Sequence, residues 1–482
     1  MFDFRPIANL IGLLIAAQGA SMAVPVVVAV ITADGEIDTF LLTGFFSLVV
    51  GGGMALSTMG TIRGKMNIQQ VFMMTTLVWL VLPVFAAIPF WVGAPGLDYT
   101  DAFFEAMSGL TTTGSTVITG LDDLPRATLM WRGMLQWFGG VGIIVVAMAL
   151  LPALKVGGMQ IFRSEGFDTM GKVLPRAAEI SVSISSIYIG LTAACAMAYG
   201  LAGLNGFDAI VHALTTISTG GYANYDASFA AMRGAPEYVA SLFMILSSLP
   251  FVRYVQLARG TAEPLVADSQ VRAFLFILGT TVGIMVTYLM VTNDGFTESA
   301  FRQSLFNVTS IMSGTGYAST DYQLWGNFAV AMFFLMGLIG GCAGSTTCSI
   351  KVFRFQLLIA AIRAQIRLIH SPHGVFTPRY EGRPVSADVY SSVMAFLVMF
   401  MVTLIGLSIA LGLMGLDMTT SVSGATAALA NIGPGLGDQI GPAGNYAGLP
   451  DAAKWLLAMA MLLGRLELMS VFVLFTFAFW RH

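Results

Sequence analysis

The chain has 482 residues, of which 56% are hydrophobic and 10% are charged, and its formal net charge is −3. Soluble globular domains carry about 25% charged residues, so this composition excludes a soluble protein and indicates an integral membrane protein. The small net charge gives no reason to expect nucleic acid as a partner. The cysteines Cys195, Cys342 and Cys348 form neither a CxxC nor a zinc-ligand pattern, and we expect them to pack as small apolar residues.

Long apolar runs predict about ten spanning helices, because a helix that crosses a bilayer needs about 20 mostly apolar residues. The first two runs, 6–31 and 39–61, are joined by the acidic turn Ala33–Glu36 and predict an N-terminal hairpin. The other eight lie at 70–91, 129–154, 180–204, 238–257, 271–291, 327–368 (interrupted), 387–413 and 453–480.

Four shorter segments lie between pairs of these later runs, and each ends in a small, hydroxylated turn rich in glycine. The segments are 100–112, 207–216, 298–312 and 419–430. If Gly114, Gly220, Gly316 and Gly433 are equivalent, the intervals are 106, 96 and 117 residues, which indicates an internal repeat. We therefore predict an N-terminal transmembrane hairpin at 1–66 and pore repeats at 67–176, 177–265, 266–385 and 386–482, the third with an interrupted second helix.

The short segments look like half-helices that enter the membrane from one side. Asp98, Asn205 and Asp417 stand 16, 15 and 16 residues before their glycines, as N-caps would, and the third segment starts from Asp294 or Thr297. Non-helical backbone at membrane depth must be buried in protein or line a watery cavity. Each half-helix then directs its partly negative C-terminal end at a central cavity, which favours a cation there.

Lys and Arg in the loops predict the orientation, because these residues gather on the cytoplasmic side. One side carries Arg5, Arg63, Lys65, Lys155, Arg163, Lys172, Arg176, Arg253, Arg259, Arg272, Lys351, Arg354, Arg363, Arg367, Arg379, Arg383 and Arg481. The other carries Arg126, Arg132, Arg233, Arg302 and Lys454. The first set marks the cytoplasm, so both termini are expected inside and the four turns open outward.

The turns suit a monovalent cation that must exchange its water shell for backbone carbonyls on one axis. Glycine allows dihedral angles that turn successive carbonyls inward, and hydroxyl neighbours can brace the loop. We predict that the ion-binding residues are Thr112, Thr113, Gly114, Ser218, Thr219, Gly220, Gly314, Thr315, Gly316, Asn431, Ile432 and Gly433. The alternative, small residues that only allow close helix packing, accounts poorly for four turns in register, each after a capped half-helix.

Several motifs carry a resemblance to a known family. The segments Leu110–Gly114, Ser218–Tyr222, Gly340–Thr346, Asn431–Gly437 and Leu463–Glu467 resemble those of the potassium-uptake subunits of the bacterial Trk system, TrkH/TrkG, in the Trk/Ktr/HKT superfamily. The resemblance covers essentially the whole chain. It implies a four-repeat pore for potassium in the bacterial inner membrane, a homodimer, and a cytosolic ring of nucleotide-binding, TrkA-like regulatory subunits.

The resemblance also bears on selectivity. In this superfamily a serine at the first filter glycine is associated with sodium permeation, and Gly114 at that position favours potassium. The third turn departs from the pattern because it has an extra glycine, Gly314, which we expect to make that wall of the filter more pliable.

Two further features lie below the predicted filter. The second helix of the third repeat is interrupted at 337–348 by four glycines and several hydroxyl residues, which a lipid-facing helix does not tolerate. We expect a flexible loop that blocks the conduit when closed; a kink packed against neighbours is the alternative. The predicted gate residues are Gly340, Gly341, Gly344, Ser345, Thr346 and Arg465.

Arg465 lies well inside the last apolar run. A charge at that depth costs about 2.5–3.5 kcal/mol, so the side chain should face the interior and serve a purpose there. Glu467 follows two residues later and points to a different helical face, which argues against a structural pair. We expect Arg465 to face the ion path as an electrostatic barrier.

The sequence thus predicts an all-α integral membrane protein that takes up potassium, with no organic cofactor, lipid around it and no enzymatic activity. A potassium symporter coupled to H+ or Na+ is the closest alternative. A transporter with inverted repeats would show two repeats rather than four parallel ones. A membrane-embedded enzyme would need clustered ionisable groups at depth, where only Arg465 and Glu467 are evident. The stretches 370–388 and 153–176 are the candidate surfaces for a cytoplasmic partner.

Overall fold

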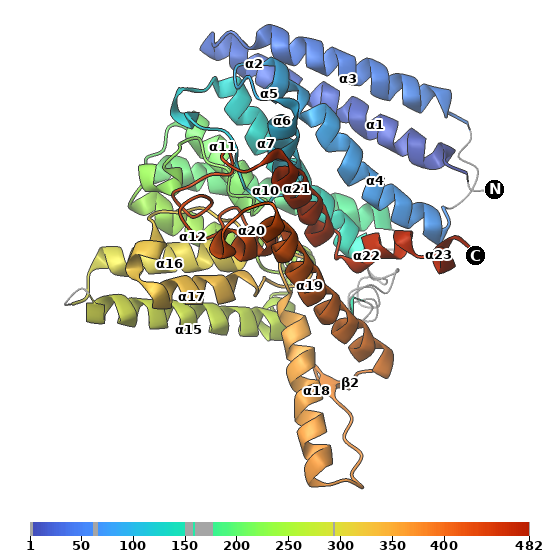
Figure 1. The fold of residues 1–482 in the computed structure, drawn as a ribbon, viewed down its shortest axis with the longest axis vertical. Helices are drawn as coiled ribbons and strands as arrows, with labels where there is room; N and C mark the ends of the chain where they lie inside the picture. The colour runs from blue at the N-terminus through green and yellow to red at the C-terminus, as the bar shows by residue number, and fades with distance from the viewer. Residues whose placement is uncertain (1–2, 61–65, 150–157, 160–176, 293–294, 482) are drawn as a thin grey trace.

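The computed structural model describes residues 3–60, 66–149, 158–159, 177–292 and 295–481. The regular secondary structure of these residues is almost entirely helical, with one antiparallel pair of two-residue strands, so the predicted all-α class is confirmed (Figure 1). The N and C termini lie near each other on one side of the molecule, next to the end of α4.

The N-terminal part forms a helical hairpin. It consists of α1 (Arg5–Ser21), α2 (Ala23–Thr32) and α3 (Ile37–Ser57). Glycines bring α1 and α3 into direct backbone contact: a Cβ on Gly12 would lie 2.7 Å from the carbonyl oxygen of Gly51, and a Cβ on Gly51 would lie 2.6 Å from that of Gly12. Small residues at such positions let two membrane helices approach closely.

Four groups of helices follow, and each contains one short buried helix. The first group is α4 (Ile68–Ala86), α5 (Ile88–Val92), α6 (Tyr99–Leu110), η1 (Leu121–Asp123) and α7 (Arg126–Ala149). The second is α10 (Ala177–Leu201), α11 (Gly206–Ile217), η2 (Ser228–Ala231), α12 (Ala235–Ser247), α13 (Phe251–Ala258) and α14 (Glu263–Ala267).

The third group is α15 (Ser269–Thr292), α16 (Glu298–Ser313), η3 (Tyr322–Trp325), α17 (Asn327–Gly337), α18 (Val352–His370), β1 (Arg379–Tyr380) and β2 (Arg383–Pro384). The fourth is α19 (Ala387–Leu413), α20 (Met418–Ala430), α21 (Asp451–Arg465), α22 (Met469–Phe472), η4 (Val473–Phe475) and α23 (Phe477–Trp480). Helix α18 and the β1–β2 pair project below the rest of the molecule (Figure 1). No observation tests the predicted boundaries of the hairpin and the repeats, which stay a prediction.

The short helices α6, α11, α16 and α20 begin at side-chain caps. The predicted caps Asp98, Asn205 and Asp417 are confirmed, because each side chain accepts a hydrogen bond from the backbone N–H three residues later. The third helix starts at Thr297, one of the two predicted residues. Hydrogen bonds from Thr420 hold the pKa of the Asp417 carboxyl below its usual range.

Within the described residues, six helices are long and apolar enough to cross a membrane, and up to eight if two bent pairs each count as one span. The sequence has ten such runs. Two of them, 238–257 and 453–480, are bent by 92° and 103°. Pro250 explains the first bend because it lacks a backbone N–H; the second contains Glu467 and Leu468 with φ of 62° and 34°. Helix α17 is short, and α7 adjoins residues outside the described part.

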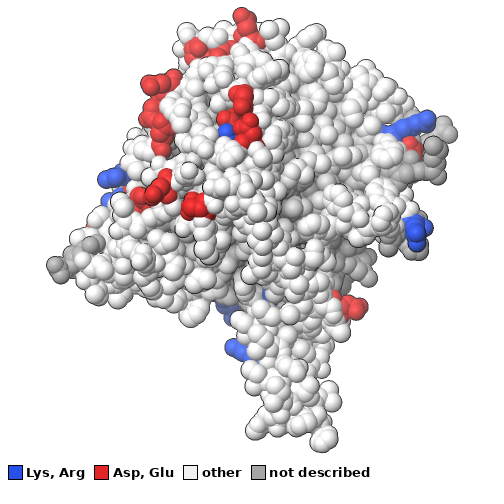
Figure 2. All heavy atoms as spheres, viewed as in Figure 1, with Lys and Arg blue, Asp and Glu red and all other residues white. Residues whose placement is uncertain are grey.

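Charge is distributed unevenly over the surface. Figure 2 shows Asp and Glu gathered over the upper left of the molecule and most Lys and Arg to the right and below. Four residues that the sequence analysis counted as loop charges are instead buried: Lys351, Arg354, Arg132 and Lys454. These four residues therefore do not indicate the orientation of the protein in the membrane, and the predicted orientation stays a prediction.

The glycine contact between α1 and α3 predicts that two nearby substitutions on α3 differ strongly in their effect on the free energy of unfolding. Gly51→Val should lower the free energy of unfolding by about 1–3 kcal/mol, because the side chain would overlap the backbone of α1. Gly53→Val, two residues along the same helix with open space around it, is the matched control. Thermal unfolding of the purified proteins in detergent measures both; equal melting temperatures would contradict this packing.

Candidate functional site

Each of the four short helices is followed by a residue whose backbone has a left-handed conformation. These residues are Thr112, Thr219, Gly314 and Asn431, with φ of 53°, 52°, 76° and 50°. Such angles are strained for residues other than glycine. The extra glycine of the third turn, Gly314, thus occupies the strained position and removes the strain there.

In the first three turns, a second residue with a left-handed backbone conformation follows two positions later. These residues are Gly114, Gly221 and Gly316, with φ of 86°, 80° and 81°. Gly433 occupies the corresponding place in the fourth turn without a positive φ. The predicted alignment, which used Gly220, is therefore wrong by one residue in the second repeat.

Hydrogen bonds confirm this corrected register. The N–H groups of Thr113, Gly220 and Ile432 each donate to the carbonyl five residues earlier. Gly220 thus corresponds to Thr113, and Gly221 corresponds to Gly114. The sequence offers two adjacent glycines in this turn, and nothing in the pattern distinguishes them.

The four turns meet around one centre. A Cβ on Gly114 would overlap the carbonyl oxygen of Gly220, and a Cβ on Gly221 would overlap that of Thr315. A Cβ on Gly316 would lie 2.7 Å from the backbone N of Gly433, and a Cβ on Gly433 would lie 2.9 Å from the carbonyl oxygen of Gly114. The contacts run from the first turn to the second, third and fourth and back to the first, so the turns form a closed ring.

The predicted ion-binding residues all lie in this ring, and those of them that carry a side chain are buried. Hydroxyl groups brace the turns: Thr111 and Thr113 are hydrogen-bonded at 2.7 Å, as are Ser313 and Thr315. The Asn431 amide donates to Thr113 Oγ1 (3.0 Å) and so joins the fourth turn to the first. These side chains hold the backbone, which leaves the backbone carbonyls as the groups available to a ligand.

Some of the ring carbonyls already accept hydrogen bonds from side chains of other segments. The Gly433 oxygen accepts from the hydroxyls of Ser115 (2.9 Å) and Tyr446 (3.0 Å). The Gly220 oxygen accepts from Gln136 Nε2 (2.6 Å). The ring is thus held on at least two walls by side chains behind it.

An open pocket leads to the ring, and one glycine of each turn lines it: Gly114, Gly221, Gly316 and Gly433. Near it the Asp226 carboxylate accepts from the backbone N–H groups of Gly120 (2.8 Å) and Leu121 (3.0 Å). This carboxylate therefore joins two loops.

The interruption in the third repeat lies on the other side of the ring and is confirmed as non-helical between α17 and α18. The loop is buried and well bonded. Its Cys342 N–H donates to the Ser248 carbonyl (3.0 Å), and its Gly344 carbonyl accepts from the Phe251 N–H (3.0 Å). The predicted residues Gly340, Gly341, Ser345 and Thr346 lie in it and are buried. The break in the second repeat and the loop of the third therefore satisfy each other's backbone groups.

Arg465 ends α21 beside this loop. Its guanidinium donates to the carbonyl oxygens of Gly139 (2.9 Å) and Thr346 (3.4 Å) and to Cys348 Sγ (2.6 Å). Glu467 pairs with Arg354 instead, so the expectation that Arg465 and Glu467 do not form a pair is confirmed. Arg465 lines a second cavity, together with residues of the loop.

Known proteins resemble this chain over its whole length. The family described as "TrkH: Cation transport protein" matches residues 37–480. The chain belongs to this family. The Trk system potassium uptake protein TrkI of Halomonas elongata is 43% identical, with 99% of this chain and 97% of that protein covered.

Two other members of the TrkH family extend the comparison. The Trk system potassium uptake protein TrkH of Escherichia coli K12 is 35% identical, over 99% of this chain and 100% of that protein. The crystal structure of the potassium transporter TrkH from Vibrio parahaemolyticus superposes with a TM-score of 0.90 and 33% identity, and covers 100% of both chains. These relatives are named as transporters, so the chain belongs to a family of transporters rather than enzymes.

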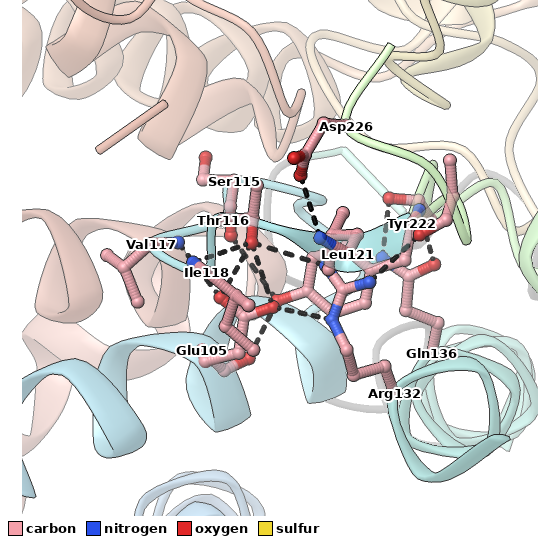
Figure 3. Close-up of polar contacts among 12 residues, drawn as sticks. Glu105, Ser115, Thr116, Val117, Ile118, Leu121, Arg132, Gln136, Tyr222 and Asp226 are labelled. Carbon is pink, nitrogen blue, oxygen red and sulfur yellow. Dashed lines mark hydrogen bonds and ion pairs between the residues drawn. The ribbon is translucent and has the colours of Figure 1, made fainter. Parts of the chain in front are cut away.

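A buried ion pair behind the first turn was not predicted (Figure 3). Glu105 of α6 and Arg132 of α7 are 2.9 Å apart and almost fully buried. Glu105 also accepts from the Val117 N–H (3.0 Å), and Arg132 Nη1 donates to the Ala223 carbonyl (2.9 Å). The pair thus joins the segments that leave the first and second turns. Arg465 and Glu467 were the only ionisable residues evident at depth from the sequence, and the buried pair of Glu105 and Arg132 shows that this prediction was wrong.

Two more unpredicted residues complete this network. Gln136 of α7 bonds the Gly220 carbonyl through Nε2 and the Tyr222 N–H through Oε1 (3.0 Å). The Tyr222 hydroxyl donates to the Glu105 carbonyl (2.8 Å), and its ring lies against the Arg132 guanidinium. The available signal was the presence of ionisable and amide groups within apolar helical runs.

Loss of the buried carboxylate should strongly destabilise the protein. Glu105→Gln would leave Arg132 as an uncompensated buried charge, which costs about 3–5 kcal/mol. The control is Glu298→Gln on α16, whose exposed carboxylate pairs with Arg302 and should contribute about 0–1 kcal/mol. Thermal unfolding in detergent compares the two. A similar loss in both variants would contradict the importance assigned to the buried pair.

Proposed function

We propose that this protein takes up potassium ions across the bacterial inner membrane through the ring formed by the four turns. The single observation that carries the proposal is the closed sequence of contacts from Gly114 through Gly221 and Gly316 to Gly433. The relatives named above as potassium uptake proteins support the choice of ion.

The mechanism follows from the backbone. A potassium ion that sheds its water needs other oxygen ligands, and rings of backbone carbonyls supply them. The four short helices end at the ring, so their partly negative C-terminal ends add to the attraction for a cation. We propose that the carbonyls of the predicted turn residues form the ion path, with Gly221 in place of Gly220 as the equivalent of Gly114.

The loop between α17 and α18 is the proposed gate. It lies on the opposite side of the ring from the open pocket, and Arg465 fixes it to α7 through Thr346 and Gly139. Opening would require the carbonyls of Ser247 and Ser248 to exchange loop donors for water. We further propose a homodimer and a cytosolic nucleotide-binding subunit that controls this loop, as the resemblance to the Trk system implies.

Alanine at the first filter glycine should block flux. In liposomes with a potassium gradient, Gly114→Ala should lower the flux by at least about tenfold, equivalent to 1.4 kcal/mol, because the methyl group would overlap the Gly220 carbonyl. Gly120→Ala is the control: its φ is also positive, at 74°, but the space around it is open. Equal flux through both variants would argue against ion passage at the ring.

Removal of the Arg465 side chain should raise the flux. Arg465→Ala removes a positive charge from the proposed path and two hydrogen bonds that fix the loop, so potassium flux should rise severalfold. Arg367→Ala, an exposed arginine on α18, is the control for a general loss of positive charge. A lower flux at unchanged thermal stability would assign Arg465 a structural role.

The symport alternative needs its own measurement. If potassium movement is coupled to H+ or Na+, an imposed gradient of the coupling ion should drive potassium against its own gradient in the same liposomes. A passive path through the ring gives potassium flux only down the electrochemical gradient of potassium. Accumulation driven by a proton or sodium gradient would favour the symporter.

A further inference from the structure

A cavity beneath the ring contains one of the three cysteines. The thiol of Cys348 lines it, together with Ser345, Thr347, Lys351 and Arg465. Cys348 is 8% exposed, whereas Cys195 and Cys342 are 0% exposed and do not line this cavity. Cys348 is thus the cysteine that a small molecule inside the cavity would meet.

Two cations flank this thiol. Arg465 Nη1 lies 2.6 Å from Cys348 Sγ, and Lys351 bonds Thr347, the residue before Cys348. Glu467 also lines the cavity but is paired with Arg354. Within the described part of the chain, no carboxylate pairs with Arg465 or Lys351. Reactive cysteines lie in such electropositive surroundings.

Arg465 provides a second, independent indication. Its side chain is 2% exposed, and its Nε has no hydrogen-bond partner among the described residues. A buried donor without a partner is costly, and this one borders the same cavity as Cys348. The wall of the cavity therefore holds a buried N–H group whose hydrogen bond is unmet.

We propose that Cys348 is a modification site: a reactive thiol that small electrophiles reach through the cavity beneath the ring. With a maleimide, the Cys348 sulfur forms a bond to one alkene carbon, the π electrons move to the neighbouring carbon, and that carbon takes a proton from water. With a methanethiosulfonate, a new disulfide forms and methanesulfinate leaves. In both reactions the thiol proton goes to solvent.

The position of Cys348 links such an adduct to transport. A Cβ on Gly314 of the third turn would lie 3.7 Å from the backbone N of Cys348, and the adjacent Ser349 N–H donates to the Ala430 carbonyl (3.1 Å), next to the fourth turn. A group added at Cys348 therefore lies directly below two walls of the ring. The effect on flux rests on the proposed function, whereas the reactivity of the thiol does not.

The reactivity is tested without any transport assay. The full chain in detergent is treated with N-ethylmaleimide, and peptide mass spectrometry follows each cysteine over time. Cys348 should be labelled at least about tenfold faster than Cys195 and Cys342. Arg465→Gln should slow labelling of Cys348 and leave Cys195 unchanged. Labelling of Cys348 no faster than that of Cys195 in the unaltered protein would overturn the proposal.

The effect on flux is tested in a second step. The protein is treated with 2-aminoethyl methanethiosulfonate before reconstitution, and treated and untreated samples are compared in liposomes. The cationic adduct should lower potassium flux at least fivefold in the unaltered chain, with no change on treatment of Cys348→Ser. Labelling without a change in flux would overturn the link to transport. An untreated protein without flux would overturn the proposed function and leave the modification site standing.

Discussion

The structure depends on the way in which backbone groups freed by helix breaks find partners at membrane depth, where lipid supplies none. The break between α12 and α13 exposes the carbonyls of Ser247 and Ser248 and the N–H of Phe251. The loop between α17 and α18 supplies donors for the carbonyls and an acceptor for the N–H. Arg465, at the end of α21, bonds the same loop. The helix breaks in the second, third and fourth groups of helices are therefore mutually dependent.

The ring above this unit is only approximately fourfold. The first three turns share a left-handed glycine, whereas Gly433 lacks the positive φ and is followed by Pro434. Its carbonyl is held by Ser115 and Tyr446. Because one polypeptide supplies all four turns, different side chains can hold each turn. Side chains such as Gln136 set the orientation of individual carbonyls. In a ring of identical subunits, by contrast, every turn would be held in the same way.

The sequence predicted the features that depend on local chemistry. Caps such as Asp98, the glycine turns and the broken helix each follow from a few neighbouring residues. Prediction from the sequence failed where tertiary contacts determine a residue's place. Gly220 and Gly221 are adjacent glycines, and only the packed ring distinguishes them. The apolar run that contains Pro250 continues past this residue, so hydropathy does not reveal the bend there. Arg132 resembles a loop charge at the start of a helix, because its partner Glu105 lies 27 residues earlier on another helix.

The contact between Ser115 and Gly433 joins residues 318 positions apart. It has a consequence for biosynthesis. The first three turns can enter the membrane while translation continues, but the circle of contacts stays open until nearly the entire polypeptide has left the ribosome. Nascent chains that stop before the last group of helices would therefore leave the Ser115 hydroxyl without its Gly433 acceptor. The ring of turns consequently closes only after the fourth turn has been made, and a chain that ends before this turn cannot form the closed ring.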